Sequence, residues 1–213
     1  MDKNVKFVYE QRVKKVIDSL EKSNMHGYFV QNEEEAKIKI KELLNVGDTV
    51  SVGGSMTLFE TSIIDLLRSG DYNFLDRYKD GITPEETQEI FRKVFSADVY
   101  IVSTNAITEQ GELYNVDGLG NRVSAMMFGP KKVIVVVGIN KIVRDIDEAI
   151  QRNKSLSGPA NIIRLSKKTP CATTGQCIDC ASPDRICNKY TVIKRENTKE
   201  RTHVIFINKF LGY

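Results

Sequence analysis

Val133-Ile134-Val135-Val136-Val137, past the middle of the chain, is the stretch that decides the fold. It is a run of β-branched residues with no polar residue between them. Such a run shows no alternation of apolar and polar positions, which predicts a strand that is covered on both faces. Strands of this kind belong to parallel sheets with helices packed on each side.

Strands and helices alternate on both sides of this run. We expect further strands at Tyr28–Val30, Thr49–Val52, Asn73–Leu75, Val99–Val102, Thr191–Lys194 and Val204–Asn208. Helices are expected over 5–23, after Asn32, over 57–69, from Thr83 to about Phe95 and over Ile142–Asn153. The alternation predicts an α/β fold with a mostly parallel sheet and helices on both faces. The stretch from Ser155 to Pro170 interrupts it, so we expect an α/β domain over 1–160 and a small C-terminal extension over 161–213.

Charge and hydropathy exclude several classes of protein. The 213 residues include 31 Lys and Arg against 28 Asp and Glu, a net charge of +3. So small an excess argues against a dedicated nucleic-acid binder. The longest apolar run, Val133–Val137, is far too short for a membrane span, and the first residues lack the core of a signal peptide. We therefore expect a soluble, cytoplasmic protein.

A glycine turn follows the strand at Thr49–Val52. Gly53, Gly54 and Ser55 lead from this strand directly into a helix. Backbone N–H groups in such a turn can approach an anionic ligand closely, with the positive end of the helix dipole behind them. The turn lacks the lysine of a P-loop and the third glycine of a dinucleotide fingerprint. A tight strand-to-helix turn with no ligand remains the alternative.

A second polar segment follows the strand at Val99–Val102. Thr104 and Asn105 come first, and Glu109 follows as a candidate acid or base whose pKa would be raised by shielding from water. The alternative for Glu109–Glu112 is a solvent-exposed hairpin turn. Further on, Gly120 permits a positive φ, and Asn121 can cap the next helix. Both polar segments leave carboxyl ends of predicted parallel strands, so we expect them to line one pocket for an anionic ligand.

Three motifs together resemble one known family. They are SVGGSMTLFETSIIDLLR (51–68), ADVYIVSTNAITEQGELYNVDGLGNR (97–122) and FGPKKVIVVVGINKI (128–142). In this order they resemble the LUD family, named for lactate utilisation, over nearly the whole chain. The resemblance implies a Rossmann-like fold allied to the ribose-phosphate isomerase, glucosamine-phosphate deaminase and CoA-transferase group. It also implies a role in bacterial oxidation of lactate to pyruvate alongside iron–sulfur partner proteins, with a ligand site at Gly53, Gly54, Ser55, Thr104, Asn105, Glu109, Gly120 and Asn121.

All four cysteines lie close together near the C-terminus. Cys171, Cys177, Cys180 and Cys187 have the spacing C-x5-C-x2-C-x6-C in a polar segment. Four thiolates make a complete ligand set for a [4Fe–4S] cluster or for zinc. Nearby basic residues would offset the negative charge of a cluster, and only one C-x2-C pair is present, so we expect [4Fe–4S] before zinc. Free or disulfide-linked cysteines remain the third alternative.

The expected function is that of a redox subunit that supports lactate oxidation, binds a small anionic metabolite and works with iron–sulfur partner proteins. Self-association into a homo-oligomer is compatible with the sequence. One alternative is a ligand-binding or regulatory module for a phosphorylated or CoA-linked metabolite, with a structural zinc. Another is an isomerase or transferase like those of the allied fold group. Whether the centre is redox-active separates these functions, since zinc cannot transfer electrons.

Overall fold

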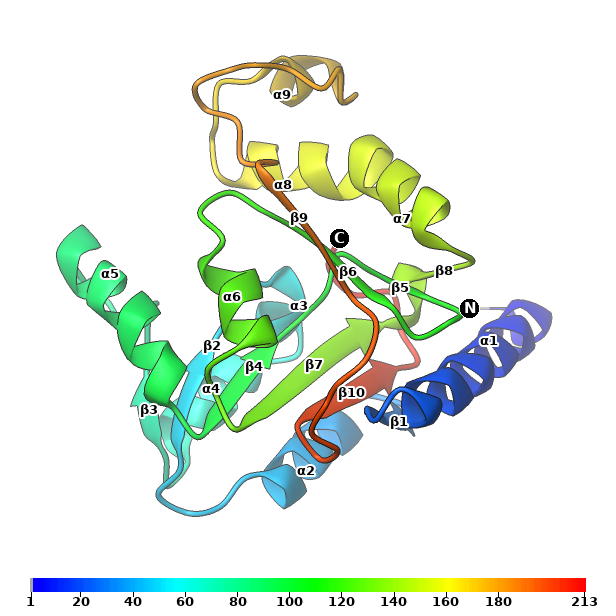
Figure 1. The fold of residues 1–213 in the computed structure, drawn as a ribbon, viewed down its shortest axis with the longest axis vertical. Helices are drawn as coiled ribbons and strands as arrows, with labels where there is room; N and C mark the ends of the chain where they lie inside the picture. Colours follow the sequence, from blue (N-terminus) through cyan, green and yellow to red (C-terminus); the bar gives the residue numbers. More distant parts are fainter. Residues whose placement is uncertain (1) are drawn as a thin grey trace.

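The computed structural model describes residues 2–213, and its centre is a six-stranded sheet (Figure 1). The strands follow the order β1-β10-β7-β4-β2-β3, and every neighbouring pair is parallel. Their bounds are β1 His26–Val30, β10 Thr202–Ile207, β7 Lys132–Gly138, β4 Val99–Val102, β2 Thr49–Val52 and β3 Asn73–Leu75. The α/β fold with a mostly parallel sheet is confirmed.

Strand β7 lies in the interior of the sheet and is covered on both faces, as its sequence predicts. Val133, Val135 and Val137 belong to one hydrophobic core, while Ile134 and Val136 belong to the core on the other face. None of these side chains is more than 1% exposed. Successive residues of a strand point to opposite faces, so a strand between two cores needs an apolar residue at every position.

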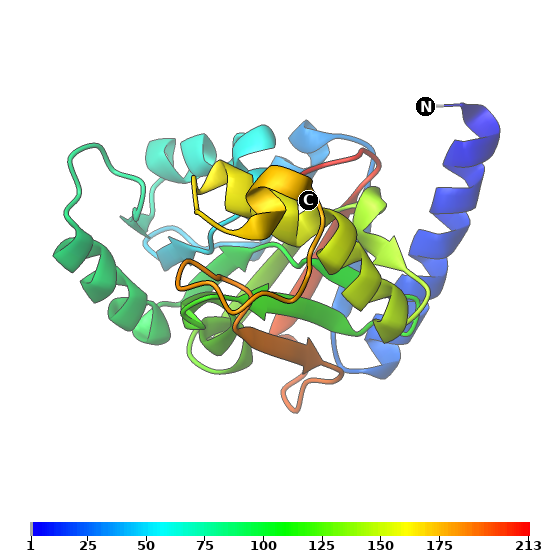
Figure 2. The ribbon, with the colours of Figure 1, turned by 90° about the horizontal axis from the view of Figure 1, so that it is seen from above.

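Helices cover both faces of the sheet. The first core includes side chains of α1 (Lys3–Lys22) and α6 (Asn121–Met127), and the second includes those of α2 (Glu33–Leu43), α3 (Met56–Glu60) and α4 (Ile63–Ser69). The remaining helices are α5 (Pro84–Lys93), α7 (Ile146–Arg152), α8 (Gly158–Arg164) and α9 (Pro170–Thr174). Helices α1 and α5 lie at opposite ends of the molecule (Figures 1 and 2). Within residues 2–213, no helix is long and apolar enough to span a membrane.

Two expected helices are shorter than the sequence pattern predicts. The helix expected over 57–69 is divided into α3 and α4, because Ser62 has a left-handed φ of 52°. The helix expected over Ile142–Asn153 begins only at Ile146, where Asp145 caps it by accepting a bond from the Glu148 N–H. Ile142 and Val143 instead form the short strand β8 and pair with β5.

A second sheet of four strands contains the polar segment that follows β4 of the first sheet. Its order is β8-β5-β6-β9, with β8 Ile142–Val143, β5 Ala106–Thr108, β6 Leu113–Asp117 and β9 Lys189–Ile193. Strands β5 and β6 are antiparallel and are joined by a hairpin turn at Glu109–Glu112, but the turn is not solvent-exposed as the alternative expected, since the side chains of Glu109 and Glu112 are only 16% and 14% exposed. Helices α7, α8 and α9 lie above this sheet in Figure 1.

The last strand belongs to the main sheet, which corrects the expected division of the chain near residue 160. Strand β10 lies between β1 and β7 and pairs in parallel with both. Val204 and Phe206 of this strand are fully buried in the first core. Residues 161–213 are therefore not a separate folding unit, because the central sheet is complete only with a strand from this segment.

Candidate functional site

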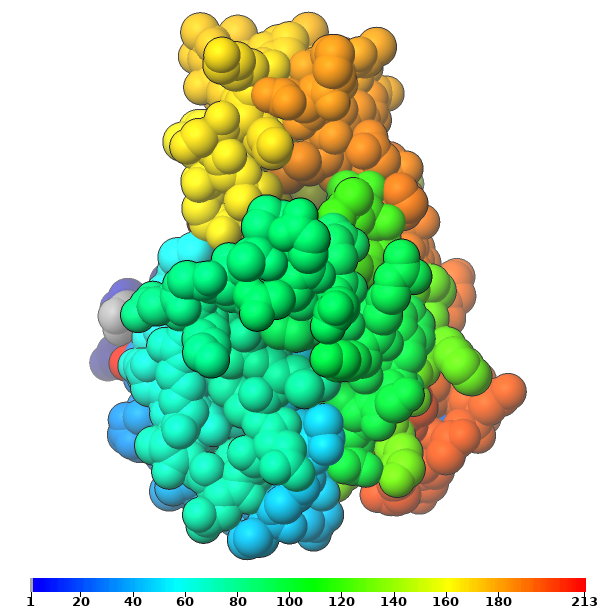
Figure 3. All heavy atoms as spheres, turned by 90° about the vertical axis from the view of Figure 1, so that its left-hand side faces the viewer, coloured from blue at the N-terminus to red at the C-terminus, as the bar shows by residue number. Residues whose placement is uncertain are grey.

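A cavity of about 570 Å³ lies outside the carboxyl ends of β2 and β4. Its floor comes from the turns after these strands, at Gly54–Met56 and Ser103–Asn105. Its roof comes from the end of α8 and from Pro183–Asn188. The latter residues end the segment 170–188, which we call the cysteine loop. In Figure 3 these yellow and orange residues stand above the green and cyan body, with a recess between them. Ligands of open parallel sheets bind at this edge.

The cavity brings together most of the predicted ligand-binding residues. Its lining includes Gly54, Ser55, Thr104, Asn105 and Asn121. Gly53 and Gly120 are not among the lining residues. A Cβ at Gly53 would lie 2.5 Å from Val102 Cγ2 and 2.9 Å from the Tyr100 hydroxyl, so this glycine permits close packing behind the turn. Gly120 has a φ of 91° and precedes α6.

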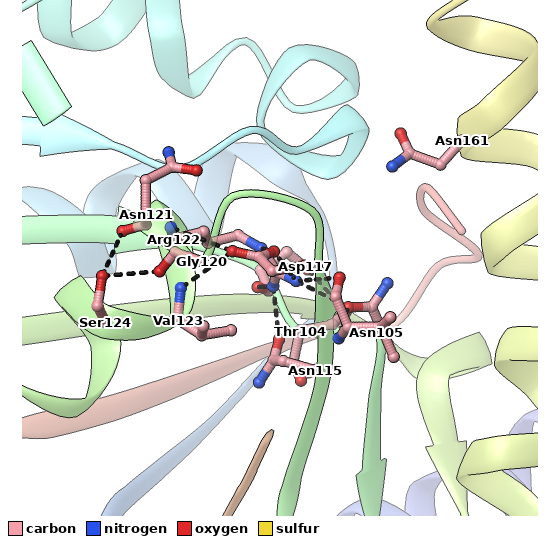
Figure 4. A network of polar contacts seen from close by, with 12 residues as sticks. Thr104, Asn105, Asn115, Asp117, Gly120, Asn121, Arg122, Val123, Ser124 and Asn161 are labelled. Atoms are coloured by element: carbon pink, nitrogen blue, oxygen red, sulfur yellow. Dashed lines mark hydrogen bonds and ion pairs between the residues drawn. The ribbon is translucent and has the colours of Figure 1, made fainter. Parts of the chain in front are cut away.

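A buried ion pair joins the turns that carry these residues. Arg122 Nη2 lies 2.8 Å from Asp117 Oδ1, and both side chains are about 10% exposed. Arg122 also donates to Asn105 Oδ1, at 2.9 Å, and to the backbone oxygen of Ser103 (Figure 4). Figure 4 shows the Asn121 side chain pointing away from this network. The charge of Arg122 is therefore compensated within the protein.

The Thr104 hydroxyl proton is engaged by backbone oxygens of the protein. Its hydroxyl donates to the backbone oxygens of Ala106 and Tyr114, each at 2.9 Å. Asn105 accepts from the Val116 N–H through Oδ1, which also receives Arg122. These two residues shape the cavity wall, while the Asn105 amide nitrogen and the Asn121 side chain stay available for a ligand.

Lys141 is one of several cavity residues that the sequence analysis missed, and the only fully buried cation among them. Its Nζ lies 3.0 Å from both Thr57 Oγ1 and Ser103 Oγ, and the residue is 2% exposed while lining the cavity. Burial lowers the pKa of Lys141 to about 7, and the cations Arg152 and Arg122 act in the same direction. Lys141 follows β7 in the sequence. Ligand sites lie outside the carboxyl ends of parallel strands, and this rule, which located the other turns, could also have located Lys141.

The cavity lining carries an excess of positive charge, although it also includes the carboxylate of Asp184. Arg77, Lys141, Arg164 and Lys167 line the cavity, and none of them forms an ion pair within residues 2–213. Ser55 Oγ and Arg77 Nε are buried without a hydrogen-bond partner. Unpartnered buried polar groups cost free energy, so a ligand that accepts hydrogen bonds from them would stabilise this arrangement. The chemistry of the cavity fits an anion.

Comparison with models of protein families shows which family this chain belongs to. Residues 13–207, nearly the whole chain, match the model of the LUD domain. The chain belongs to the LUD domain family. This confirms the family that the three sequence motifs resemble. Membership supports a function of the lactate-utilisation type at the level of the family.

One solved structure with this fold matches nearly the whole LUD domain. The domain is similar to a DUF162 family protein from Deinococcus radiodurans, with 14% identity, a TM-score of 0.54 and coverage of 93% of this chain and 98% of the other. Weaker similarities reach eIF2B delta from Chaetomium thermophilum (21% identity, TM-score 0.37, 56% and 50% coverage) and ribose 5-phosphate isomerase from Plasmodium falciparum (19%, 0.34, 53% and 52%). No curated protein matches the chain.

Glu109, the predicted catalytic acid or base, does not line the cavity of this LUD domain. It accepts hydrogen bonds from Lys15 Nζ at 2.6 Å and from Arg12 Nε at 3.1 Å, both on α1. The Lys15 ammonium, together with Arg12, lowers the pKa of Glu109 although partial burial alone would raise it. The expectation of a raised pKa is therefore wrong, because two cations of α1 lie beside the carboxylate. Glu109 joins α1 to the β5–β6 turn.

The cysteine loop of the LUD domain gathers four free thiols. Burial raises the pKa of the Cys187 thiol, and the nearby thiols of Cys177, Cys171 and Cys180 raise it further. The donor type therefore fits a thiolate-bound centre. Within residues 2–213, no group of three or more His, Cys, Asp or Glu side chains is arranged to hold a metal ion. The four thiols are near enough for the other three to act on Cys187, but they do not form such a group.

Proposed function

We propose that this LUD-domain chain takes part in the oxidation of lactate to pyruvate as the subunit that binds the metabolite. In that reaction a 2-hydroxy acid becomes a 2-oxo acid and gives up two electrons and two protons. The electrons would pass to iron–sulfur proteins, which the family resemblance implies as partners. Family membership and the excess of positive charge in the cavity lining support this proposal.

Lys141 is the observation that carries the anion-binding part of the proposal. A buried lysine without an ion pair in the described chain is stabilised by any anion that enters the cavity. The carboxylate of lactate or pyruvate can accept from the Lys141 ammonium, from the unpartnered Arg77 Nε or from Ser55 Oγ. Such charge-assisted hydrogen bonds are about twice as strong as neutral ones.

Calorimetric titration of the purified chain with lactate and with pyruvate tests this part. We expect binding of both, and a loss of about tenfold or more in affinity for Lys141→Met, because a charge-assisted bond contributes roughly 1.5–3 kcal/mol. The exposed Lys168→Met is the control, since Lys168 is not among the cavity-lining residues. Absence of binding by either acid, or equal binding by the Lys141 variant, would contradict the proposal.

We further propose that Cys171, Cys177, Cys180 and Cys187 bind one [4Fe–4S] cluster, with zinc as the alternative. Such a cluster supplies one-electron transfer when bound. The gathered thiols and the surrounding cations of the loop support it. The test is the visible spectrum of protein purified without oxygen, joined to iron and zinc analysis. A brown chromophore with about four irons per chain is the expected result, and neither metal after anaerobic reconstitution contradicts the assignment.

The volume of the cavity favours a second candidate function. About 570 Å³ is far more space than lactate fills, and lies in the range of sites for larger ligands. A regulatory or binding module for a phosphorylated or CoA-linked metabolite would use the same cations for its phosphates. Titration with CoA and with inorganic phosphate distinguishes the two. Micromolar binding of CoA together with no binding of lactate or pyruvate would favour this second function.

A further inference from the structure

We propose that Lys141 is a carbonyl-reactive amine, whose Nζ forms a reversible imine with the keto carbon of a 2-oxo acid in the cavity. The inference rests on the proposed function, because pyruvate is the 2-oxo acid of that reaction. It assigns covalent chemistry to the cavity beyond anion binding.

The position of Lys141 is the first support. The residue follows β7 and lines the cavity, so a bound ligand can reach its amine from the open side. Thr57 Oγ1 and Ser103 Oγ, each 3.0 Å away, hold Nζ in place. No ion pair within residues 2–213 involves Lys141, and the Glu60 carboxylate, which favours its protonated form, acts less strongly than burial and the cations Arg152 and Arg122.

The electrostatic surroundings favour the neutral amine that such a reaction needs. Burial and the neighbouring cations Arg152 and Arg122 bring the pKa of Lys141 to about 7. Near neutral pH about half of the molecules then carry an uncharged Nζ, whereas roughly one in 2,500 molecules does so at an ordinary lysine. Desolvation and nearby cations are the two means by which proteins activate lysine as a nucleophile.

The chemical step balances without any oxidant or reductant. The lone pair of Nζ attacks the keto carbon, and a proton moves from nitrogen to the former carbonyl oxygen. This gives a carbinolamine, whose hydroxyl takes up the second proton of the nitrogen and leaves as water while the C=N bond forms. Ser103 Oγ and Thr57 Oγ1 are close enough to Nζ to pass the proton. The carboxylate of the 2-oxo acid would remain bound to the cavity cations and to unpartnered donors of the lining, Arg77 Nε and Ser55 Oγ.

Reductive trapping on the wild-type chain tests the inference. Pyruvate and sodium borohydride are added at pH 7, and the lysine that carries the reduced adduct is located by peptide mass spectrometry. We expect at least about tenfold more adduct on Lys141 than on Lys167, because a lower pKa leaves more neutral amine. Lys167 is the matched comparison, since it lines the same cavity but is exposed. Lactate, which has no keto group, is the control ligand and should give no adduct.

The outcomes separate this inference from the proposed function. Adduct concentrated on Lys141 with pyruvate supports the imine. Calorimetric binding of pyruvate without adduct on Lys141, or adduct spread evenly over exposed lysines, overturns the imine and leaves anion binding intact. If pyruvate neither binds in the calorimetric titration nor forms an adduct, both the imine and the proposed function are contradicted. Because the trapping uses the wild-type chain, a failure of a Lys141 variant to fold cannot obscure the result.

Discussion

The guanidinium of Arg185 donates a 2.6 Å hydrogen bond to the backbone oxygen of Cys180, and the same side chain lines the cavity. A second bond of 2.9 Å reaches the backbone oxygen of Cys187. An ion pair of 2.7 Å with Asp179 and a bond to the Tyr190 hydroxyl complete its contacts. One side chain thus joins two of the four cysteine positions to the wall of the cavity.

Arg185→Met should loosen the cysteine loop and weaken ligand binding together. The change leaves the carbonyl oxygens of Cys180 and Cys187 without their donor, so we expect faster amide hydrogen exchange over 177–188. We also expect weaker binding of pyruvate in the calorimetric titration. The central sheet should exchange as in the wild type, because no contact of Arg185 reaches it.

Lys168→Met is the matched control for this change. It removes a positive charge from the same segment, but its exposed side chain forms no hydrogen bond or ion pair within residues 2–213. Arg185 does not join the loop to the cavity if amide exchange over 177–188 is the same in Arg185→Met as in the wild type. The same conclusion follows if Lys168→Met changes this exchange as much as Arg185→Met does.

Gly53→Ala should destabilise the protein. The new Cβ would lie 2.5 Å from Val102 Cγ2 and 2.9 Å from the Tyr100 hydroxyl, and both neighbours are buried. Overpacking of this kind costs about 1–3 kcal/mol of unfolding free energy. Chemical denaturation followed by circular dichroism measures the change.

Gly54→Ala is the control for that variant and has a different expected result. Its Cβ would lie 3.7 Å from the Tyr78 hydroxyl and 3.8 Å from Arg77 Nη1, which is ordinary contact. The unfolding free energy should therefore change by less than about 1 kcal/mol, while the added methyl group on the cavity floor should weaken pyruvate binding. Equal destabilisation by the two alanines would contradict the packing described for Gly53.

Glu109→Gln should lower stability near neutral pH but not in acid. The folded protein holds the pKa of Glu109 below its ordinary value of 4.5, because Lys15 and Arg12 favour the carboxylate. The stabilisation is therefore present above the unfolded pKa and is lost as pH falls through the lower, folded pKa. We expect a difference of roughly 1 kcal/mol at pH 7 in urea unfolding, disappearing toward pH 3.

Glu34→Gln serves as the comparison for Glu109. The Glu34 side chain is 77% exposed, although it pairs with Lys37. Exposed pairs of this kind contribute little, so its removal should be nearly neutral at both pH values. A pH-independent effect of Glu109→Gln would contradict the ion pairs assigned to it.

Arg122→Met should be the most destabilising of these substitutions. It leaves Asp117 as a buried, unpaired carboxylate, which costs about 3–5 kcal/mol. The double variant Arg122→Met, Asp117→Asn removes that charge as well and should recover part of the loss. Thermal and urea unfolding measure both. If the double variant is no more stable than Arg122→Met alone, the ion pair is not the source of the effect.

Local patterns were sufficient to predict the six strands of the main sheet and the edge of that sheet where the site lies. The run at Val133–Val137 specifies a doubly covered strand because burial on both faces excludes polar residues at every position. Turns that leave the ends of parallel strands must meet at one edge, so Gly54 and Thr104 could be placed together from sequence. The cysteine spacing likewise places four thiols on one short loop.

Only the tertiary structure decided which distant residues became neighbours. Lys15 lies 94 positions from Glu109, and no local pattern indicates that α1 would bring its cations to that turn. Strand β10 is the last strand along the chain but lies inside the sheet between β1 and β7, so its neighbours do not follow from order along the sequence. The low pKa of Lys141 has the same origin, since desolvation and the approach of Arg152 and Arg122 exist only after the chain has folded.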